Sequence, residues 1–232
     1  MIKTLSYTSK GPRQSNQDFI TSSEFDVVHS VYIVADGMGG YEYGEVASQI
    51  VATSIIDFFS DPIHWNPTKL IFEKLASKLF LNLKDEANKL SCAQLGSTVA
   101  GVFFTEESTF LFWIGDVRIY HFRQGQLIYQ TRDHSFLNEM KENGTITAEL
   151  IQRYSHIVSR SLNNKALSTF DFTQTKFFSG DTIIICSDGV HNIVPESLLT
   201  SLINTQQIII QPIIDYCSER AKDNFSIIIL NI

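Results

Sequence analysis

The sequence predicts an α+β fold, because its strand-like segments come in groups while its helical segments come in separate pairs. The strand-like segments are short apolar runs rich in Val, Ile, Phe and Tyr, and each helical segment carries one apolar stripe. The strict alternation of strand and helix that builds a parallel sheet is missing. At 232 residues the chain is long enough for one substantial core, so a single domain over residues 1–232 is expected.

Several segments have the composition of strands. They are residues 27–35, 98–104, 109–114, 118–122, 127–130, 182–187 and 225–231. Short polar breaks, among them Gly115-Asp116, separate the consecutive strands between residues 98 and 130. These strands are therefore expected to form an antiparallel meander.

Helices are predicted in both halves of the chain. Residues 44–59 and 68–91 repeat apolar side chains at helical spacing. A later helix is expected to start at Pro195, which suits a first helical position, and another to cover about 209–221. The least regular long stretch, residues 132–181, has room for a mobile flap.

Composition excludes several classes of function. The formal net charge is −7 and Lys and Arg form no run, so neither nucleic acid nor an anionic membrane is an expected partner. The three cysteines lie at wide spacings typical of neither disulfides nor zinc sites, and Cys186 is expected in the core. The N-terminus lacks a signal-peptide pattern and no window approaches the ~18 apolar residues of a membrane span, which predicts a cytoplasmic protein.

Carboxylates stand at the ends of several apolar runs. Asp36 follows one run and precedes Gly37, Asp188 follows a second, and Asp223 precedes the last strand. If antiparallel neighbours bring these ends together, the like charges repel unless a cation compensates them. With oxygen donors and no Cys or His cluster, the pattern indicates Mg²⁺ or Mn²⁺; the alternative for each Asp-Gly pair is a tight turn.

Two further groups could take part in the same chemistry. Arg13 precedes Asp18 in one polar stretch, and a planar guanidinium can hold phosphate oxygens bidentately; the alternative is a surface loop with an ion pair. Asp116 adds a carboxylate at the start of a strand, although an Asp in a Gly-Asp turn is more often structural.

Short motifs follow one another along the chain in a recognisable order. They are Arg13-x-x-Asn16-x-Asp18, DGMGG from Asp36, Gly96-Ser97-Thr98, GDVR from Gly115, TRDHS from Thr131, SDG from Ser187 and Asp223-Asn224. From about residue 6 to residue 231 the chain resembles the PPM family, the metal-dependent type 2C protein Ser/Thr phosphatases. This resemblance implies a four-layer αββα sandwich, in which two mostly antiparallel β-sheets are flanked by helix pairs, with a flap-like segment at about 136–165.

The resemblance also implies a site with two Mn²⁺ or Mg²⁺ ions and a weaker third ion. Asp36 would bridge the first two ions, and Asp188 and Asp223 would complete the shell of one of them. The carbonyl of Gly37 would help to bind the second ion, whose waters Asp18 would support. Asp116 with Asp188 would hold the third ion.

The implied activity is hydrolysis of phosphoserine and phosphothreonine monoesters in proteins, by in-line attack of a metal-bridging water on a phosphoryl group gripped by Arg13. The expected partner is a phosphorylated protein, with the chain acting as a monomer that opposes a Ser/Thr kinase. The alternative is a pseudophosphatase, a regulatory module that binds a phosphoprotein or another partner without turnover.

Four positions depart from the family pattern; Val117 and Asn163 affect the expected flap and substrate contacts, and Gln17 and Met38 affect the site. Gln17 stands where the family usually has Glu, and a neutral amide offers an oxygen without the negative charge, so the second metal is expected to bind more weakly. Met38 stands where some members carry a His proposed to protonate the leaving group, so no general acid is assigned. His134 and His191 are interpreted as structural residues.

Overall fold

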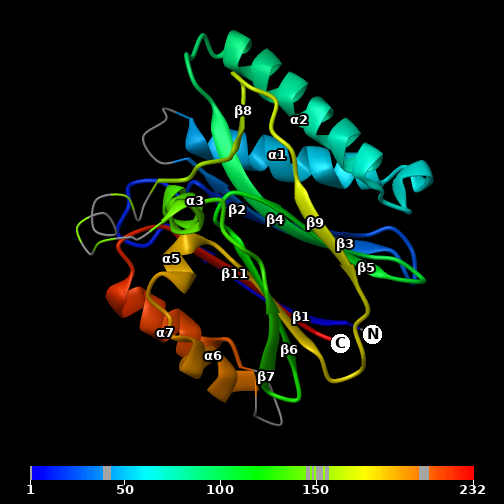
Figure 1. Ribbon diagram of the computed structural model, residues 1–232, viewed down its shortest axis with the longest axis vertical. Helices are drawn as coiled ribbons and strands as arrows, with labels where there is room; N and C mark the ends of the chain where they lie inside the picture. The colour runs from blue at the N-terminus through cyan, green and yellow to red at the C-terminus, as the bar shows by residue number, and fades with distance from the viewer. Residues whose placement is uncertain are drawn as a thin grey trace.

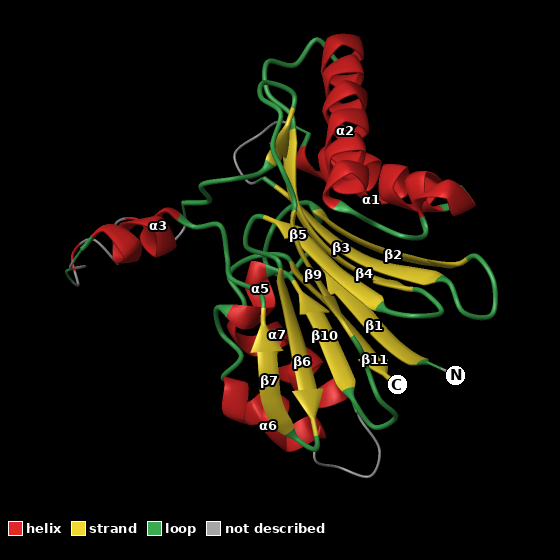
Figure 2. Cartoon of the chain, turned by 45° about the vertical axis from the view of Figure 1, so that its right-hand side comes forward, coloured by secondary structure: helices red, strands yellow, loops and turns green. Residues whose placement is uncertain are grey.

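The computed structural model describes residues 2–38, 43–144, 147, 149, 154, 157–203 and 209–232. Two β-sheets stack face to face, and a pair of helices covers each outer face (Figures 1 and 2). Every strand pair in the described part of the chain is antiparallel. The predicted α+β class and the four-layer αββα arrangement are confirmed.

One layer pair consists of a six-stranded sheet and two long helices. The strand order is β2-β3-β4-β5-β9, with β8 pairing with β4. The bounds are β2 (Asp18–Glu24), β3 (Ser30–Gly37), β4 (Gly96–Phe104), β5 (Thr109–Ile114), β8 (Leu162–Asn163) and β9 (Asp171–Thr175). The covering helices are α1 (Gly44–Phe59) and α2 (Lys69–Lys89), joined by a short 3₁₀ helix, η1 (Pro62–His64).

The other layer pair consists of a five-stranded sheet and two shorter helices. The strand order is β1-β11-β10-β6-β7. The bounds are β1 (Lys3–Ser9), β6 (Arg118–Arg123), β7 (Gln126–Gln130), β10 (Thr182–Cys186) and β11 (Phe225–Asn231). The helices are α6 (Glu196–Ile203) and α7 (Gln211–Arg220), while α3 (Phe136–Asn143) and the short α5 (Asp188–His191) belong to neither helix pair.

Three hydrophobic clusters hold the four layers together. The first, which includes Phe59 and Phe103 stacked with ring centroids 4.4 Å apart, joins α1 and α2 to the six-stranded sheet. The second lies between the sheets, and the third joins the five-stranded sheet to α6 and α7. Because side chains of each sheet alternate between its faces, each sheet contributes to two clusters. Cys186 is fully buried, as predicted.

The predicted helices are present, and the unpredicted strands lie mostly at sheet edges. The strands that sequence patterns did not indicate are β1, β2, β8 and β9, and three of these are edge strands. An edge strand exposes much of its surface, so its sequence is more polar; β1 reads KTLSYTS and alternates exposed and half-buried residues. Strand β3 begins at Ser30, whereas the prediction placed its start at residue 27.

The predicted meander between residues 98 and 130 is wrong at its centre. Strands β4 and β5 pair, and β6 and β7 pair, but β5 and β6 belong to different sheets. The chain passes from one sheet to the other at Gly115-Asp116. Gly115 has φ of +102°, and a Cβ atom there would lie 2.3 Å from the Cβ of Thr98, so the crossing requires glycine. Asp116 is thereby placed between the ends of the two sheets.

The expected flap is described only in part. Its first turns form α3, which projects away from the sandwich in Figure 2, and its end forms β8. Residues 145–146, 148, 150–153 and 155–156 of the expected flap lie outside the described residues, as do residues 39–42 after the Asp36 motif. Among the described helices, none has the length and hydropathy needed to span a membrane.

Candidate metal centre

The residues predicted for the site meet at one end of the sandwich. Asp36 lies at the end of β3, Asp188 directly follows β10, and Asp223 directly precedes β11, while Asp116 lies at the crossing between the sheets. A cleft of about 440 Å³ opens between these elements. Of the predicted residues, it is lined by Arg13, Gln17, Asp36, Gly37, Asp116, Asp188 and Asp223.

Asp18 is the predicted residue that lies behind the cleft. It faces Asp36 directly in the β2–β3 ladder and is only 6% exposed. Its Oδ2 accepts a hydrogen bond of 2.7 Å from the hydroxyl of Ser187, while its Oδ1 is buried and has no partner among the described residues. Burial, more than the charge of Asp223, raises the pKa of Asp18 to about 6. An unpartnered buried oxygen at this place fits a bound cation or its water.

The carboxyl groups of the cleft act on one another electrostatically. Burial raises the pKa of Asp36 well above its ordinary value, and the charges of Asp18, Asp188, Asp116 and Asp223 raise it further. Burial followed by the charge of Asp116 raises the pKa of Asp188 to about 7. Several carboxylates that resist ionisation together are stabilised when a divalent cation compensates them.

Asp116 lies just before β6 and is affected by the segment that follows β7. Burial, followed by the charge of Asp133, raises the pKa of Asp116 to about 6. Its backbone carbonyl accepts a hydrogen bond of 2.8 Å from Nε2 of His191. Burial lowers the pKa of His191 to about 4, so its ring is neutral and holds the proton on Nε2.

The carboxylates do not by themselves form a closed ligand set. In the part of the chain that the structure describes, no three Asp, Glu, His or Cys side chains converge closely enough to hold a metal ion. A site built here would therefore include backbone carbonyls and water, as hydrated Mg²⁺ and Mn²⁺ sites do. The oxygen-only donor set and the unpartnered oxygen of Asp18 fit such ions.

Glycine brings two backbone segments together at the floor of the cleft. A Cβ atom on Gly37 would lie 2.1 Å from the carbonyl oxygen of Gly44 at the start of α1. The Gly37 amide also donates a hydrogen bond of 2.9 Å to the carbonyl of Gln17. The side-chain amide of Gln17 in turn packs against Gly44, where an added Cβ would lie 2.6 Å from Nε2. Gln17 thus sits between the cleft and α1.

Arg13 lies at the mouth of the cleft and is tied to its acidic wall. Its Nη2 donates a hydrogen bond of 2.6 Å to Oδ2 of Asp223, and its Nε donates one of 3.2 Å to the carbonyl of Lys222. A guanidinium has five N–H donors, so these contacts orient Arg13 and leave donors for an anionic ligand. Arg13 therefore forms the predicted ion pair and also faces the site.

Asn224 is a structural residue of the site for which the sequence analysis proposed no role. Its Oδ1 accepts the backbone amide of Gln17 at 2.9 Å, and its Nδ2 donates to the carbonyls of Lys10 and Ser15, both at 2.8 Å. These bonds attach the loop that carries Arg13 to the start of β11. Its position beside Asp223 was visible in the sequence, but its partners lie more than two hundred residues away.

His134 is hydrogen-bonded on both ring nitrogens, which agrees with its structural interpretation. Its Nδ1 accepts the amide of Gly115 at 3.0 Å, and its Nε2 lies 3.1 Å from Oδ2 of Asp171 on β9. His134 thus ties the crossing beside Asp116 to the edge of the six-stranded sheet. His134 holds the backbone of Gly115 and His191 holds that of Asp116, so each residue of the crossing is fixed by a histidine.

Comparison with known proteins identifies the family. A family model described as "Protein phosphatase 2C" matches residues 10–223. A "Putative protein phosphatase" of Mycoplasma genitalium is 26% identical over 245 residues, which cover 97% of this chain and 93% of that protein. The "Serine/threonine phosphatase stp" of Listeria monocytogenes (serotype 4b) is 26% identical over 188 residues, which cover 76% of this chain and 73% of that protein.

Solved structures share the fold. The serine/threonine phosphatase of S. agalactiae superimposes with a TM-score of 0.86 at 22% identity, with 100% of both chains covered. The catalytic domain of the serine threonine protein phosphatase PstP, solved in complex with two manganese ions, superimposes with a TM-score of 0.76 at 23% identity, covering 99% of this chain and 97% of that one. Since the family match extends over nearly the whole length, the chain belongs to the protein phosphatase 2C family.

Proposed function

We propose that this chain hydrolyses phosphoserine and phosphothreonine monoesters in proteins, with divalent cations bound at the Asp36 cleft. The observation that carries the proposal is the cleft itself, where carboxyl groups from separate strand ends raise one another's pKa beside an oriented guanidinium. Family membership supports the reaction class. The relatives described above are named as phosphatases, and nothing about them favours a pseudophosphatase.

Different residues of the cleft would bind different cations. In this proposal Asp36 would be shared by two Mn²⁺ or Mg²⁺ ions, Asp188 and Asp223 would help to hold one of them, and Gly37 and Gln17 would help to hold the other. Asp18 would support the waters of the second ion from behind, and Asp116 with Asp188 would hold a weaker third ion. When bound, the ions would supply an activated water and offset charge on the phosphoryl oxygens.

The chain's own side chains position the phosphoryl group. Arg13 is oriented by Asp223 and by the Lys222 carbonyl, so its remaining N–H donors can hold two phosphoryl oxygens. Met38 lines the cleft and has no proton to donate, so it cannot serve as a general acid for the leaving group. We also propose that the protein acts as a single-domain monomer in the cytoplasm on substrates of a Ser/Thr kinase; the sharing of clusters between layers supports one folding unit.

A chelation assay tests the proposal. Purified protein is given a phosphothreonine peptide with Mn²⁺, with excess EDTA, and with EDTA followed by an excess of Mn²⁺. We expect phosphate release with Mn²⁺, its loss with EDTA and its recovery with added metal. Release that EDTA leaves unchanged would contradict the metal mechanism. No turnover at any metal concentration would favour the non-catalytic alternative.

Gln17→Glu is expected to lower the Mn²⁺ concentration for half-maximal activity by roughly three- to tenfold, because it adds an anionic oxygen beside Gly37. The measurement is a Mn²⁺ titration of peptide hydrolysis. Gln49→Glu on the exposed side of α1 makes the same charge change away from the cleft and should leave the titration unchanged. Identical titrations for both variants and the parent protein would remove Gln17 from the candidate ligands.

A further inference from the structure

A second, larger cleft adjoins the candidate metal centre. Its volume is about 690 Å³. It shares Asp116 and Asp188 with the cleft of about 440 Å³ that contains Asp36, which we call the metal cleft. We call the larger one the α3 cleft. Its lining residues come from the sheet crossing and β6, the end of β7 and the segment that follows it, α3, and α5 with the residue after it. They are Asp116, Arg118, Gln130, Thr131, Arg132, Asp133, Ser135, Leu137, Asn138, Lys141, Asp188, His191 and Asn192.

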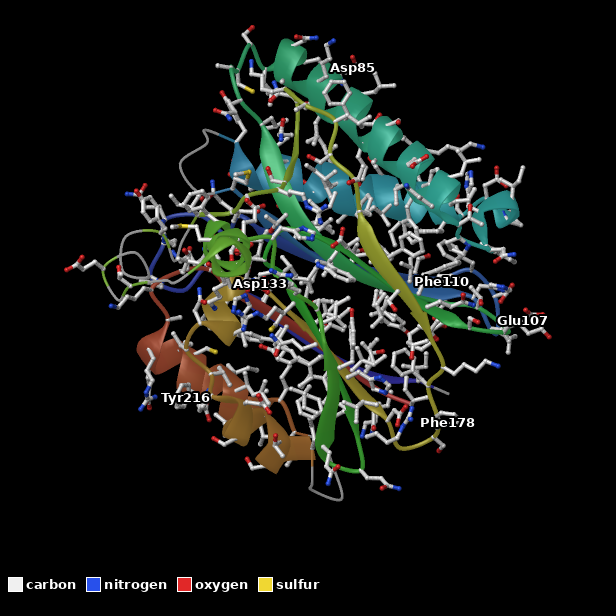
Figure 3. All side chains as sticks on the ribbon, viewed as in Figure 1. Asp85, Glu107, Phe110, Asp133, Phe178 and Tyr216 are labelled. Atoms are coloured by element: carbon white, nitrogen blue, oxygen red, sulfur yellow. The ribbon has the colours of Figure 1, made fainter. Side chains whose placement is uncertain are left out.

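The size of the α3 cleft exceeds what a phosphate group requires. Pockets of ~300–1,000 Å³ bury ligands of drug size, and a few residues of polypeptide are of that size. Because both clefts share Asp116 and Asp188, a chain whose phosphorylated residue lies in the metal cleft can continue into the α3 cleft without leaving the protein surface. In Figure 3, Asp133 marks this cleft, between α3 and α5.

Arg118 and Asp133 form a hydrogen-bonded ion pair at the floor of the α3 cleft. Arg118 donates from Nε and Nη2 to the two carboxylate oxygens of Asp133, at 2.8 and 2.6 Å. The Nδ2 of Asn138 donates to the backbone carbonyl of Asp133 at 2.9 Å, which attaches α3 to this floor. Arg118 and Asp133 neutralise one another. Away from Asp116 and Asp188, which this cleft shares with the metal centre, the charge that a ligand meets therefore comes from the rim.

The rim is cationic on the side away from the metal centre. Arg132 is exposed, and its Nη2 donates to the carbonyl of Asn138 at 3.0 Å, which keeps the guanidinium at α3. Lys141 lies one turn further along α3, is exposed, and forms no ion pair with any described residue. Arg132 and Lys141 thus place two cationic side chains on the rim formed with α3.

Polar groups suited to a peptide backbone complete the rim. The side chains of Gln130 and Asn192 line the cleft and are exposed. Gln130 ends β7, an edge strand of the five-stranded sheet, and an edge strand can offer backbone donors and acceptors to an extended peptide. The cleft therefore combines backbone-directed amides with a cationic end.

We propose that the α3 cleft binds the polypeptide that flanks the phosphorylated residue and selects substrates with acidic side chains there, through Lys141 and Arg132. The inference rests on the proposed phosphatase function, since it assigns the phosphorylated residue itself to the metal cleft. Substrate selection is thereby placed on α3, outside the residues that carry the reaction.

Lys141→Glu tests this assignment on three substrates: a phosphothreonine peptide with acidic flanks, the same peptide with neutral flanks, and p-nitrophenyl phosphate. We expect kcat/KM to fall about fivefold for the acidic peptide, mainly through KM, because an exposed attraction becomes a repulsion. The neutral peptide and p-nitrophenyl phosphate should change less than twofold. Lys74→Glu on the exposed face of α2 carries the same charge change and should alter none of the three.

Two outcomes would overturn the proposal: equal losses on both peptides, or no loss on the acidic one. Binding of fluorescently labelled peptides to the metal-free protein, followed by anisotropy, gives a readout that does not need turnover. If no phosphoester is hydrolysed, the phosphatase proposal fails, while anisotropy still decides the cleft. Tighter binding of the acidic peptide that Lys141→Glu abolishes supports it, and equal binding of both peptides refutes it.

Discussion

Asp36→Asn is expected to lower kcat/KM for p-nitrophenyl phosphate by about 10³-fold or more at saturating Mn²⁺. The negative charges of the other four carboxylates of the site all raise the pKa of Asp36. On β3 it pairs with Asp18 of β2 on one side and with Thr98 of β4 on the other. The substitution keeps the shape of the side chain and removes the anionic charge that would join two cations. The other carboxylates cannot take the place of Asp36, because each is fixed on a different segment of the fold.

The same variant should remain folded, and this separates loss of chemistry from loss of structure. The pKa of Asp36 is raised in the folded protein, so without metal its ionisation costs stability as pH rises through that pKa. Metal-free Asp36→Asn should therefore melt no lower than the parent protein at pH 8. Asp85→Asn, at the outer end of α2 in Figure 3, should change neither property. Retained activity above one tenth would contradict the proposed bridging role.

Asp181→Ala is expected to lower the free energy of unfolding by about 3–5 kcal/mol, or the melting temperature by about 10 °C. Asp181 is 1% exposed and accepts hydrogen bonds from Arg123 at 2.9 and 2.8 Å. It also accepts the Phe178 amide at 3.0 Å and lies 2.9 Å from Nε2 of His121. Removing the carboxylate leaves the buried ring of His121 and the Phe178 amide without this acceptor, while the half-buried Arg123 keeps its hydrogen bond to the Lys176 carbonyl.

The hydrogen-bonded group of Asp181, Arg123 and His121 lies at the opposite end of the sandwich from the metal centre. Asp181 precedes β10, whose other end leads to Asp188, and Figure 3 shows Phe178 far from Asp133. Asp181→Ala should therefore reduce stability while kcat/KM at low temperature is retained. Asp57→Ala, an exposed carboxylate on α1, is the matched control and should change the melting temperature by less than about 2 °C.

The effect of Asp181 should also depend on pH. Hydrogen bonds from Arg123, Phe178 and His121 outweigh the opposing effect of burial and lower the pKa of Asp181 to about 2. A carboxylate with a depressed folded pKa stabilises the protein above its unfolded pKa of ~3.9, and this contribution is lost as pH falls toward the folded value. The difference in melting temperature between Asp181→Ala and the parent should be full at pH 6 and shrink between pH 4 and pH 2. A constant difference would contradict the charge-based explanation.

Local sequence patterns predicted the helices, whereas the edge strands and the crossing between the sheets were not predicted correctly. Helical periodicity identified α1, α2, α6 and α7, because each of these helices packs a single apolar stripe against the sheet that it covers. The polar edge strands β1, β2 and β9 lack a comparable signal. The Gly115-Asp116 break looks like a hairpin turn in sequence, since a turn and a crossing between sheets use the same residue types.

The sequence alone determined the chemistry of this protein: oxygen donors at the ends of apolar strands, an arginine near them, and a motif order that resembles one phosphatase family. The tertiary structure decided which of these groups face one another. It places Asp18 behind Asp36, Asp116 at the crossing of the sheets, and Asn224 on the amide of Gln17, 207 residues away in sequence. Local propensity depends on neighbours along the chain, whereas strand order and sheet stacking follow from burial shared among distant segments, so these contacts could not be read from spacing.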